Sequence, residues 1–258
     1  MTPADDRAQR VPLVAANWKM HLLRRDVEDF ARALGAGLGD PRAEVVVFPS
    51  HPLLAPAANA LALAAARVAL GGQDLHPELK GAFTGDVSGA QLLDAGCTWV
   101  LCGHSERRRD HAENDELVGR KVAAAERSGL VPLLCVGERR EERHAGETLA
   151  VLERQLAAGL ASRPQRFAVA YEPVWAIGTG ETATPEIAQE AHAFLREQLV
   201  GRYGIETAER TRIVYGGSVT PENAAALREE ADIDGFLVGG ASLDVGKFLA
   251  IIRVCGSA

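Results

Sequence analysis

Short apolar runs recur along the chain, and segments rich in Ala, Leu, Glu and Arg separate them. Most of the runs are continuous in Val, Leu and Ile rather than alternating with polar residues, which is typical of β-strands buried on both faces. The sequence therefore predicts eight buried strands, at residues 12–16, 44–48, 67–70, 98–101, 131–136, 167–171, 211–215 and 235–238.

The segments between the runs carry the marks of helices. Ser88 and Gln91 have the spacing of a capping box at a helix start. Thr184 and Thr220 each precede a proline, as an N-cap residue often precedes proline at the first helical position. Four leucines spaced three or four residues apart would share one helical face: Leu149, Leu152, Leu156 and Leu160.

Eight alternating strands and helices favour one α/β fold. Alternation implies parallel strands joined by right-handed crossovers, and eight such units in about 250 residues match the size of a closed (β/α)8 barrel. A doubly wound open sheet is the alternative, but no Gly-x-Gly-x-x-Gly follows the first strand. No change of composition marks a boundary, so we expect residues 10–255 to form a single barrel domain after a flexible tail at residues 1–9.

Composition narrows the setting in which the protein works. The net charge is −7 and the pI is about 5.6, so no basic field favours nucleic acid or an anionic membrane as a partner. The four cysteines form no Cys-x-x-Cys pair, and three of them lie in or beside apolar runs. With no signal peptide and no membrane-spanning stretch evident, we expect a cytoplasmic protein with reduced cysteines.

Chemically capable residues follow several of the predicted strands, where a barrel of this kind has its active site. Asn17 and Lys19 follow the first strand, and a lysine there can supply a cation to a phosphate or a developing oxyanion. His104 follows the fourth strand and opens a helix, whose dipole favours a neutral imidazole that can donate to a carbonyl oxygen. Each residue alone also fits an ordinary surface or strand-end position.

Glu172 ends the sixth run and precedes a stiff, apolar loop. Pro173 cannot continue a central strand, and Trp175 and Ile177 are large apolar side chains for a loop. Such a loop tends to fold onto something, so residues 174–179 could form a lid that excludes water from a general base. A glutamate that only ends a strand and pairs with a lysine is the alternative for this segment.

Pairs of glycines follow the last two runs, before Ser218 and at Gly239 and Gly240. Consecutive glycines let backbone N–H groups approach a phosphate, and the loops after strands seven and eight are the usual phosphate site of this barrel. The seven histidines are scattered and no cofactor motif occurs, so we expect neither metal nor cofactor. A base, a neutral electrophile, a cation and a phosphate site suit proton transfer next to a carbonyl through an enediolate.

Six motifs in order identify a family. They are Asn17-Trp18-Lys19-Met20, Gly81-Ala82-Phe83-Thr84-Gly85, Gly103-His104-Ser105-Glu106-Arg107-Arg108, Cys135-Val136-Gly137-Glu138, the segment from Ala170 to Gly180, and Tyr215-Gly216-Gly217-Ser218-Val219. With them the chain resembles the triosephosphate isomerase family, from about Val11 to Val254. The resemblance implies a TIM barrel with Glu172 as the proton-shuttling base, His104 as the electrophile and Lys19 as the cation. It implies substrate binding by Asn17, Gly178, Ser218, Gly239 and Gly240.

The resemblance also implies an activity and an assembly. The activity is the cofactor-free interconversion of dihydroxyacetone phosphate and D-glyceraldehyde 3-phosphate, in glycolysis and gluconeogenesis. The assembly is a homodimer, in which the loop from Gln73 to Asp86 brings Thr84 to the partner's site. His21, Asp74 and Asp86 depart from the family's more usual Asn, Asn and Glu, which concerns interface geometry rather than chemistry.

Two alternatives to this activity stay open. The same chemistry could act on a four-carbon sugar phosphate, since the lid and phosphate loops would permit both substrates. A non-catalytic barrel used as a binding protein is the other alternative. Such a protein would be expected to have lost at least one of Lys19, His104 and Glu172, and all three are present.

Overall fold

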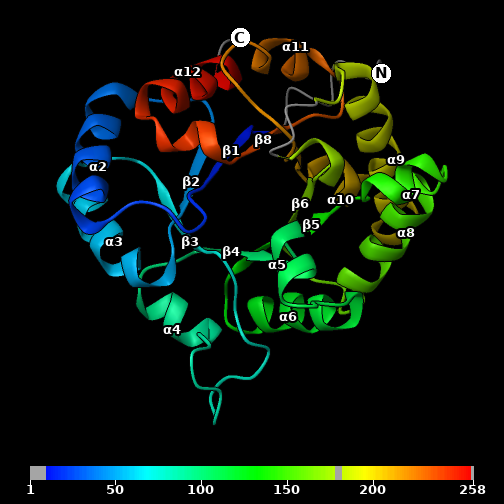
Figure 1. Cartoon of the computed structure of the whole chain (residues 1–258), viewed down its shortest axis with the longest axis horizontal. Coiled ribbons are helices and arrows are strands. Elements are labelled where there is room, and N and C mark those ends of the chain that lie inside the picture. The colour runs from blue at the N-terminus through cyan, green and yellow to red at the C-terminus, as the bar shows by residue number, and fades with distance from the viewer. Residues whose placement is uncertain (1–9, 178–181, 257–258) are drawn as a thin grey trace.

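The computed structural model describes residues 10–177 and 182–256, and in it eight parallel strands form a closed barrel inside a ring of helices (Figure 1). The strand order follows the chain, and β1 pairs with β8 to close the sheet. This confirms the predicted (β/α)8 barrel and excludes the open sheet. The strands are β1 Leu13–Asn17, β2 Glu44–Phe48, β3 Ala69–Gly72, β4 Trp99–Cys102, β5 Val131–Val136, β6 Ala168–Tyr171, β7 Ile213–Tyr215 and β8 Gly235–Val238.

All eight strands begin and end within two residues of the predicted bounds. The prediction succeeds because strands that are buried on both faces appear in the sequence as unbroken apolar runs. On β1, Leu13 and Ala15 belong to the cluster inside the barrel, whereas Val14 and Ala16 pack against the surrounding helices. Apolar side chains are therefore required at successive positions. The interior is tightly filled: a β-carbon added at Gly71 would lie 2.2 Å from the Phe48 ring.

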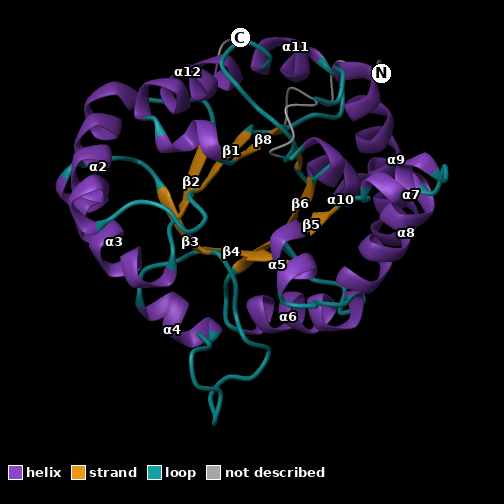
Figure 2. Ribbon diagram, viewed as in Figure 1, coloured by secondary structure: helices purple, strands orange, loops and turns teal. Residues whose placement is uncertain are grey.

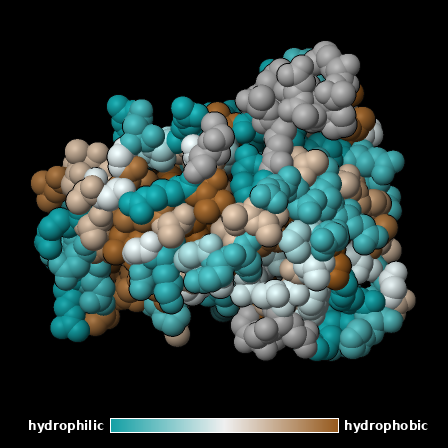
Figure 3. Space-filling view, turned by 90° about the horizontal axis from the view of Figure 1, so that it is seen from above, coloured by the Kyte–Doolittle hydropathy of each residue, from teal (hydrophilic) through white to brown (hydrophobic). Residues whose placement is uncertain are grey.

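The helices cover the outside of the barrel on all sides (Figure 2). Hydrophilic side chains cover much of the outer face that Figure 3 shows, as expected for helices that turn their apolar sides to the barrel. No helix of the described residues is long and apolar enough to cross a membrane. The helices are α2 Arg24–Leu38, α3 Leu54–Leu63, α4 Gly89–Asp94, α5 Ser105–Asp110, α6 Asp115–Arg127, α7 Arg140–His144, α8 Thr148–Gly159, α9 Pro185–Tyr203, α10 Ile205–Arg210, α11 Ala224–Glu229 and α12 Val245–Gly256, with 3-10 turns η1 His51–Leu53, η2 Val174–Ala176 and η3 Gly240–Leu243.

Two of the predicted helix starts are confirmed. Ser88 caps α4 and forms a reciprocal capping box with Gln91, whose backbone N–H lies 3.3 Å from Ser88 Oγ. Thr184 caps α9, accepting a hydrogen bond from Ile187 N at 3.4 Å. Local sequence was sufficient here because the capping contacts are made within four residues.

Of two other expectations about helices, one was wrong and one was confirmed only in part. Thr220 does not cap a helix: it begins a turn closed by Asn223, and α11 starts only at Ala224. The expected leucine face is confirmed at Leu152, Leu156 and Leu160, which are buried, but not at Leu149, which is 39% exposed because α8 turns Val151 toward the core in its place. At Leu149 the packing of the whole helix, rather than the leucine spacing, decides the outcome. At Thr220 a local turn decides it.

Candidate active site

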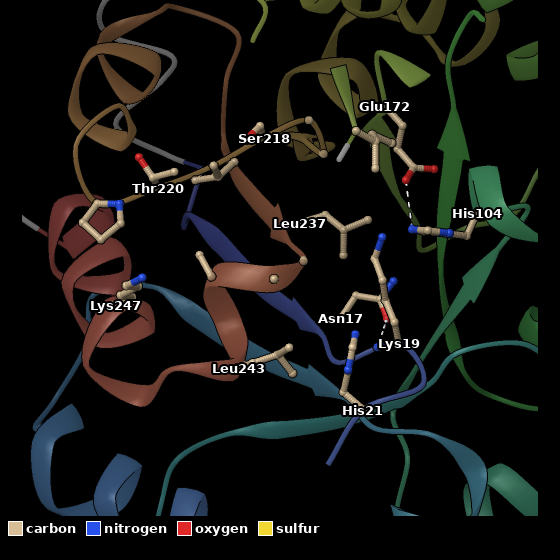
Figure 4. Close-up of a pocket in the computed structure, with 18 of the residues that line it drawn as sticks. Asn17, Lys19, His21, His104, Glu172, Ser218, Thr220, Leu237, Leu243 and Lys247 are labelled. Carbon is tan, nitrogen blue, oxygen red and sulfur yellow. Dashed lines mark hydrogen bonds and ion pairs between the residues drawn. The ribbon is translucent and has the colours of Figure 1, made fainter. Parts of the chain in front are cut away.

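A cavity of about 540 Å³ opens at the carboxyl ends of the strands (Figure 4). It brings together residues that lie more than 200 positions apart in the chain. Seven of the eight predicted site residues line it: Asn17, Lys19, His104, Glu172, Ser218, Gly239 and Gly240. The eighth, Gly178, lies outside the described residues.

Glu172 follows β6, and only 2% of its surface is exposed. Its carboxylate accepts hydrogen bonds from Ser105 N at 3.0 Å and Ser105 Oγ at 3.2 Å, and its Oε1 lies 3.0 Å from His104 Nε2. Burial raises the pKa of the carboxyl, but His104, the Ser105 amide and Lys19 together bring the pKa below its ordinary value. Glu172 is therefore ionised and able to accept a proton.

His104 is the N-cap residue of α5, as the sequence predicted. Its Nδ1 accepts a hydrogen bond from Glu106 N at 3.3 Å, so the ring proton lies on Nε2 and points toward Glu172. The same Nδ1 lies 3.6 Å from a Glu106 carboxylate oxygen, which is too far for a hydrogen bond. Nε2 is therefore the ring nitrogen that His104 directs into the corner of the cavity beside Glu172.

Lys19 is held in an uncommon backbone conformation, with φ of 50°. Its N–H donates to Asn17 Oδ1 at 3.0 Å, and its carbonyl accepts from Gln73 Nε2 at 2.8 Å. Its Nζ lies 2.7 Å from Glu106 Oε1. These contacts fix the direction of the ammonium group, and the strain they hold is of order 1–3 kcal/mol.

Glu106 and Gln73 received no role from the sequence, although both hold Lys19 in place. Gln73 also donates to Phe48 O at 2.9 Å, so it ties the loop after β1 to the end of β2. A signal for Glu106 was available, because it stands two residues after His104 in a short helix at a strand end. Nothing local distinguishes Gln73 from other polar residues that follow a strand.

The loops after β7 and β8 form the side of the cavity opposite Glu172 and His104 (Figure 4). The 3-10 turn η3 begins at Gly240, so its first N–H groups have no partner within the turn. A β-carbon at Gly217 would lie 2.2 Å from Tyr215 Oη. Glycine is therefore required for the chain to pass Tyr215 and present Ser218 to the cavity.

Glu138 is a further buried carboxylate beside the site, and no sequence motif assigned it a separate role. It accepts hydrogen bonds from Tyr171 Oη at 3.2 Å and Trp175 Nε1 at 2.8 Å. Burial raises the pKa of this carboxyl above its usual value. Glu138 thereby fastens η2, the start of the predicted lid, to the end of β5, although residues 178 and 179 of that lid lie outside the described residues.

Together these features define a class of enzyme: a (β/α)8 barrel that carries out acid–base chemistry on a small, anionic carbonyl compound. Comparison with known proteins narrows this class, because the family model described as triosephosphate isomerase matches residues 12–255. The chain therefore belongs to the triosephosphate isomerase family.

Relatives of this family match nearly the whole chain. The triosephosphate isomerase of Moorella thermoacetica is 51% identical over 248 residues, which cover 95% of this chain and 98% of that protein. That of Symbiobacterium thermophilum is 51% identical over 254 residues, or 96% of this chain and 98% of the relative. That of Acidithiobacillus ferrooxidans is 50% identical over 256 residues, with the same two shares. The resemblance seen in the six motifs is confirmed.

Proposed function

We propose that Glu172, His104 and Lys19 perform the reaction of this family, the interconversion of dihydroxyacetone phosphate and D-glyceraldehyde 3-phosphate. The observation that carries the proposal is the 3.0 Å approach of His104 Nε2 to Glu172 Oε1 in a buried corner of the cavity. It places a base and a hydrogen-bond donor side by side, where neighbouring carbon and oxygen atoms of one substrate can reach both.

The proton moves between the two carbons by way of Glu172. Its carboxylate takes a proton from the carbon next to the carbonyl, and the C–H electron pair forms the double bond of an enediolate. His104 donates its Nε2–H to the oxygen on which negative charge develops, and Lys19 stabilises the same charge. His104 transfers its Nε2 proton to this oxygen and takes up the proton of the adjacent hydroxyl, so that the hydroxyl oxygen becomes the new carbonyl while Glu172 returns its proton to the neighbouring carbon. Proton transfer of this kind typically contributes about 10²–10⁴-fold to the rate.

The phosphate of the substrate lies against the glycine loops in this proposal. Backbone N–H groups of Ser218, Gly239 and Gly240 bind it at the start of η3, which is a favourable position for an anion. Gly178 completes the phosphate site by family resemblance. Asn17 orients the substrate and, through its hydrogen bond to the Lys19 amide, the lysine itself.

A coupled assay with two substrates tests this function. We expect rapid turnover of D-glyceraldehyde 3-phosphate and much slower turnover of erythrose 4-phosphate at equal concentrations. Preference for the four-carbon substrate would replace the triose assignment with its close alternative. Absence of turnover with either would favour the non-catalytic barrel and overturn the proposal.

We also propose that the protein is a two-fold dimer that assembles through the loop from Gln73 to Asp86. This loop, between β3 and α4, stands out from the barrel (Figure 1). Phe83 at its tip is 41% exposed and stacks on His76 with ring centroids 3.9 Å apart. An exposed apolar side chain on a protruding loop often indicates a contact with another protein chain.

A second cavity, of about 460 Å³, is the socket for the partner's loop in this proposal. It lies beside Lys19 and Glu106 and is bordered by Met20, which is 92% exposed. A loop tip inserted there would bring the partner's Thr84 next to Lys19. The contact would be made twice by symmetry.

We infer a cytoplasmic location from the cysteines. All four are buried free thiols: Cys97, Cys102, Cys135 and Cys255. Proteins of reducing compartments keep cysteines in this state. Fractionation of cells that produce the protein would test this location.

A further inference from the structure

The walls of the active-site cavity pose an electrostatic problem for an anionic substrate. Four charged side chains of the described residues line it: Lys19, Glu172, Glu222 and Lys247. The charge of Lys19 is balanced by the Glu106 carboxylate, 2.7 Å from Nζ, so this pair adds no net charge beside the cavity. Glu172 and Glu222 then leave two negative charges on the walls, within a protein whose net charge is −7.

The positive charge of Lys247 offsets these negative charges. Among the described cavity-lining residues it is the one cation without an ion-pair partner within 4 Å. It is exposed, and it lies near the start of α12, where its backbone N–H donates to Asp244 Oδ1 at 3.0 Å. Figure 4 shows it across the cavity from Glu172 and His104, with the glycine loops between.

Glu222 shares this outer part of the cavity with Lys247. The Thr220 hydroxyl is the main cause of the lowered pKa of Glu222, and the charge of Lys247 contributes to it. The two side chains are thus close enough to interact, yet they form no ion pair. They stand at the mouth as separate charges of opposite sign.

We propose that Lys247 captures the anionic substrate at the mouth of the cavity, and that Glu222 opposes this capture. The inference rests on the proposed function, because the attraction matters only if the substrate carries a phosphate. Lys247 contacts no reacting atom in this scheme. It raises the local concentration of the dianion beside the loops of Ser218 and Gly240, where the phosphate is then bound.

Steady-state kinetics at two ionic strengths test the proposal. At about 10 mM salt the Debye length is about 30 Å, and at about 1 M it is about 3 Å. A unit charge acting on a dianion within about 10 Å in water changes the encounter by about threefold. We therefore expect Lys247→Gln to lower kcat/KM about threefold at low salt, Glu222→Gln to raise it similarly, and Lys247→Arg to match the unmodified protein. In all three variants kcat should stay the same.

The matched control is Arg166→Gln, which changes the net charge by the same amount as Lys247→Gln. Arg166 is exposed and lies just before β6, at the end of the barrel away from the cavity. The three glutamine variants should converge on the unmodified kcat/KM at high salt. An equal loss in Arg166→Gln and Lys247→Gln, a loss that persists at 1 M salt, or a fall in kcat would each overturn the proposal. Turnover by the unmodified protein tests the proposed function separately.

Discussion

At the scale of single residues, the contacts of Glu172 explain how a buried carboxylate stays charged. Ser105 donates two hydrogen bonds to it and His104 presents a third donor at 3.0 Å. Hydrogen bonds to the charged form offset the cost of burial. These hydrogen bonds keep the carboxylate ionised before substrate binds. A substrate C–H must then compete with Ser105 for the same carboxylate oxygens.

Glu172→Gln should abolish nearly all turnover while the fold persists. Glutamine has a similar shape but cannot take a proton from carbon, so we expect kcat to fall by about 10²–10⁴-fold. Circular dichroism and a melting curve would establish that the variant is folded. Glu190→Gln, at an exposed position on α9, removes the same charge and should keep full activity. Near-normal kcat in folded Glu172→Gln would contradict the role of Glu172.

His192 should make the protein less stable as the pH falls. It is fully buried on α9, and burial lowers its pKa to about 4 although a hydrogen bond to the Asp232 carbonyl acts in the opposite direction. Between pH 6.5 and 4 the unfolded chain binds a proton at this histidine and the folded chain does not. The free energy of unfolding therefore decreases as the pH is lowered through this range, and His192 contributes at most about 1.4 kcal/mol per pH unit to the decrease.

Urea titrations at one protein concentration, repeated from pH 7 to 4, would measure this effect. His192→Gln should show a shallower fall in the free energy of unfolding than the unmodified protein. His144→Gln, at an exposed position on α7, controls for the loss of a histidine. Parallel pH dependences of His192→Gln and the unmodified protein would show that His192 does not couple folding to pH.

At the scale of secondary-structure elements, the residues that follow the strands line the active site, and the apolar runs of the sequence indicate where the strands end. The strands could be predicted because two buried faces require unbroken apolar runs, and the residues that follow them could then be assigned to one end of a barrel. Gln73, Glu106 and Glu138 were missed because their roles arise from contacts with residues distant in the chain. Thr220 failed as a cap because Asn223 closes a turn before α11 begins.

Shortening the lid should expose the intermediate to a side reaction. We expect a variant with residues 174–179 replaced by two glycines to release methylglyoxal and inorganic phosphate, because an enediolate open to water can lose its phosphate before it is reprotonated. Derivatisation of the dicarbonyl product would quantify it. Trp175→Phe keeps the lid at full length while it removes the N–H bonded to Glu138, and it should isomerise cleanly. Clean isomerisation by the shortened variant would show that the lid does not protect the intermediate.

At the scale of the whole molecule, the active site stands beside the proposed dimer contact. Lys19 lines both the substrate cavity and the socket proposed for the partner's loop. Its ammonium group is held by Glu106, which lines that socket too. In the proposed dimer, assembly and catalysis would share residues, so we expect loss of the dimer to disturb the Lys19 cation.

Replacing Phe83 and Thr84 by glutamates should give a folded monomer with little activity. The cations that line the socket, Lys19, Arg107 and Arg109, already pair with carboxylates of their own chain. Two glutamates at the loop tip would therefore lose water there without a free partner, which costs several kcal/mol per ion. Sedimentation velocity would report the monomer, and kcat/KM its activity. Leu63→Glu places a charge at a residue of α3 that is 89% exposed, and should leave an active dimer. A monomer with full kcat/KM would refute the claim that the partner completes the site.

The pairing of β1 with β8 also has a consequence for synthesis on the ribosome. The strand Leu13–Asn17 cannot complete its hydrogen bonds on one side until Gly235–Val238, more than 200 residues later in the chain, has been synthesised. Throughout that time an apolar strand edge remains open to other chains. Producing this protein quickly therefore carries a risk of aggregation that the finished barrel, which has no edge, does not share.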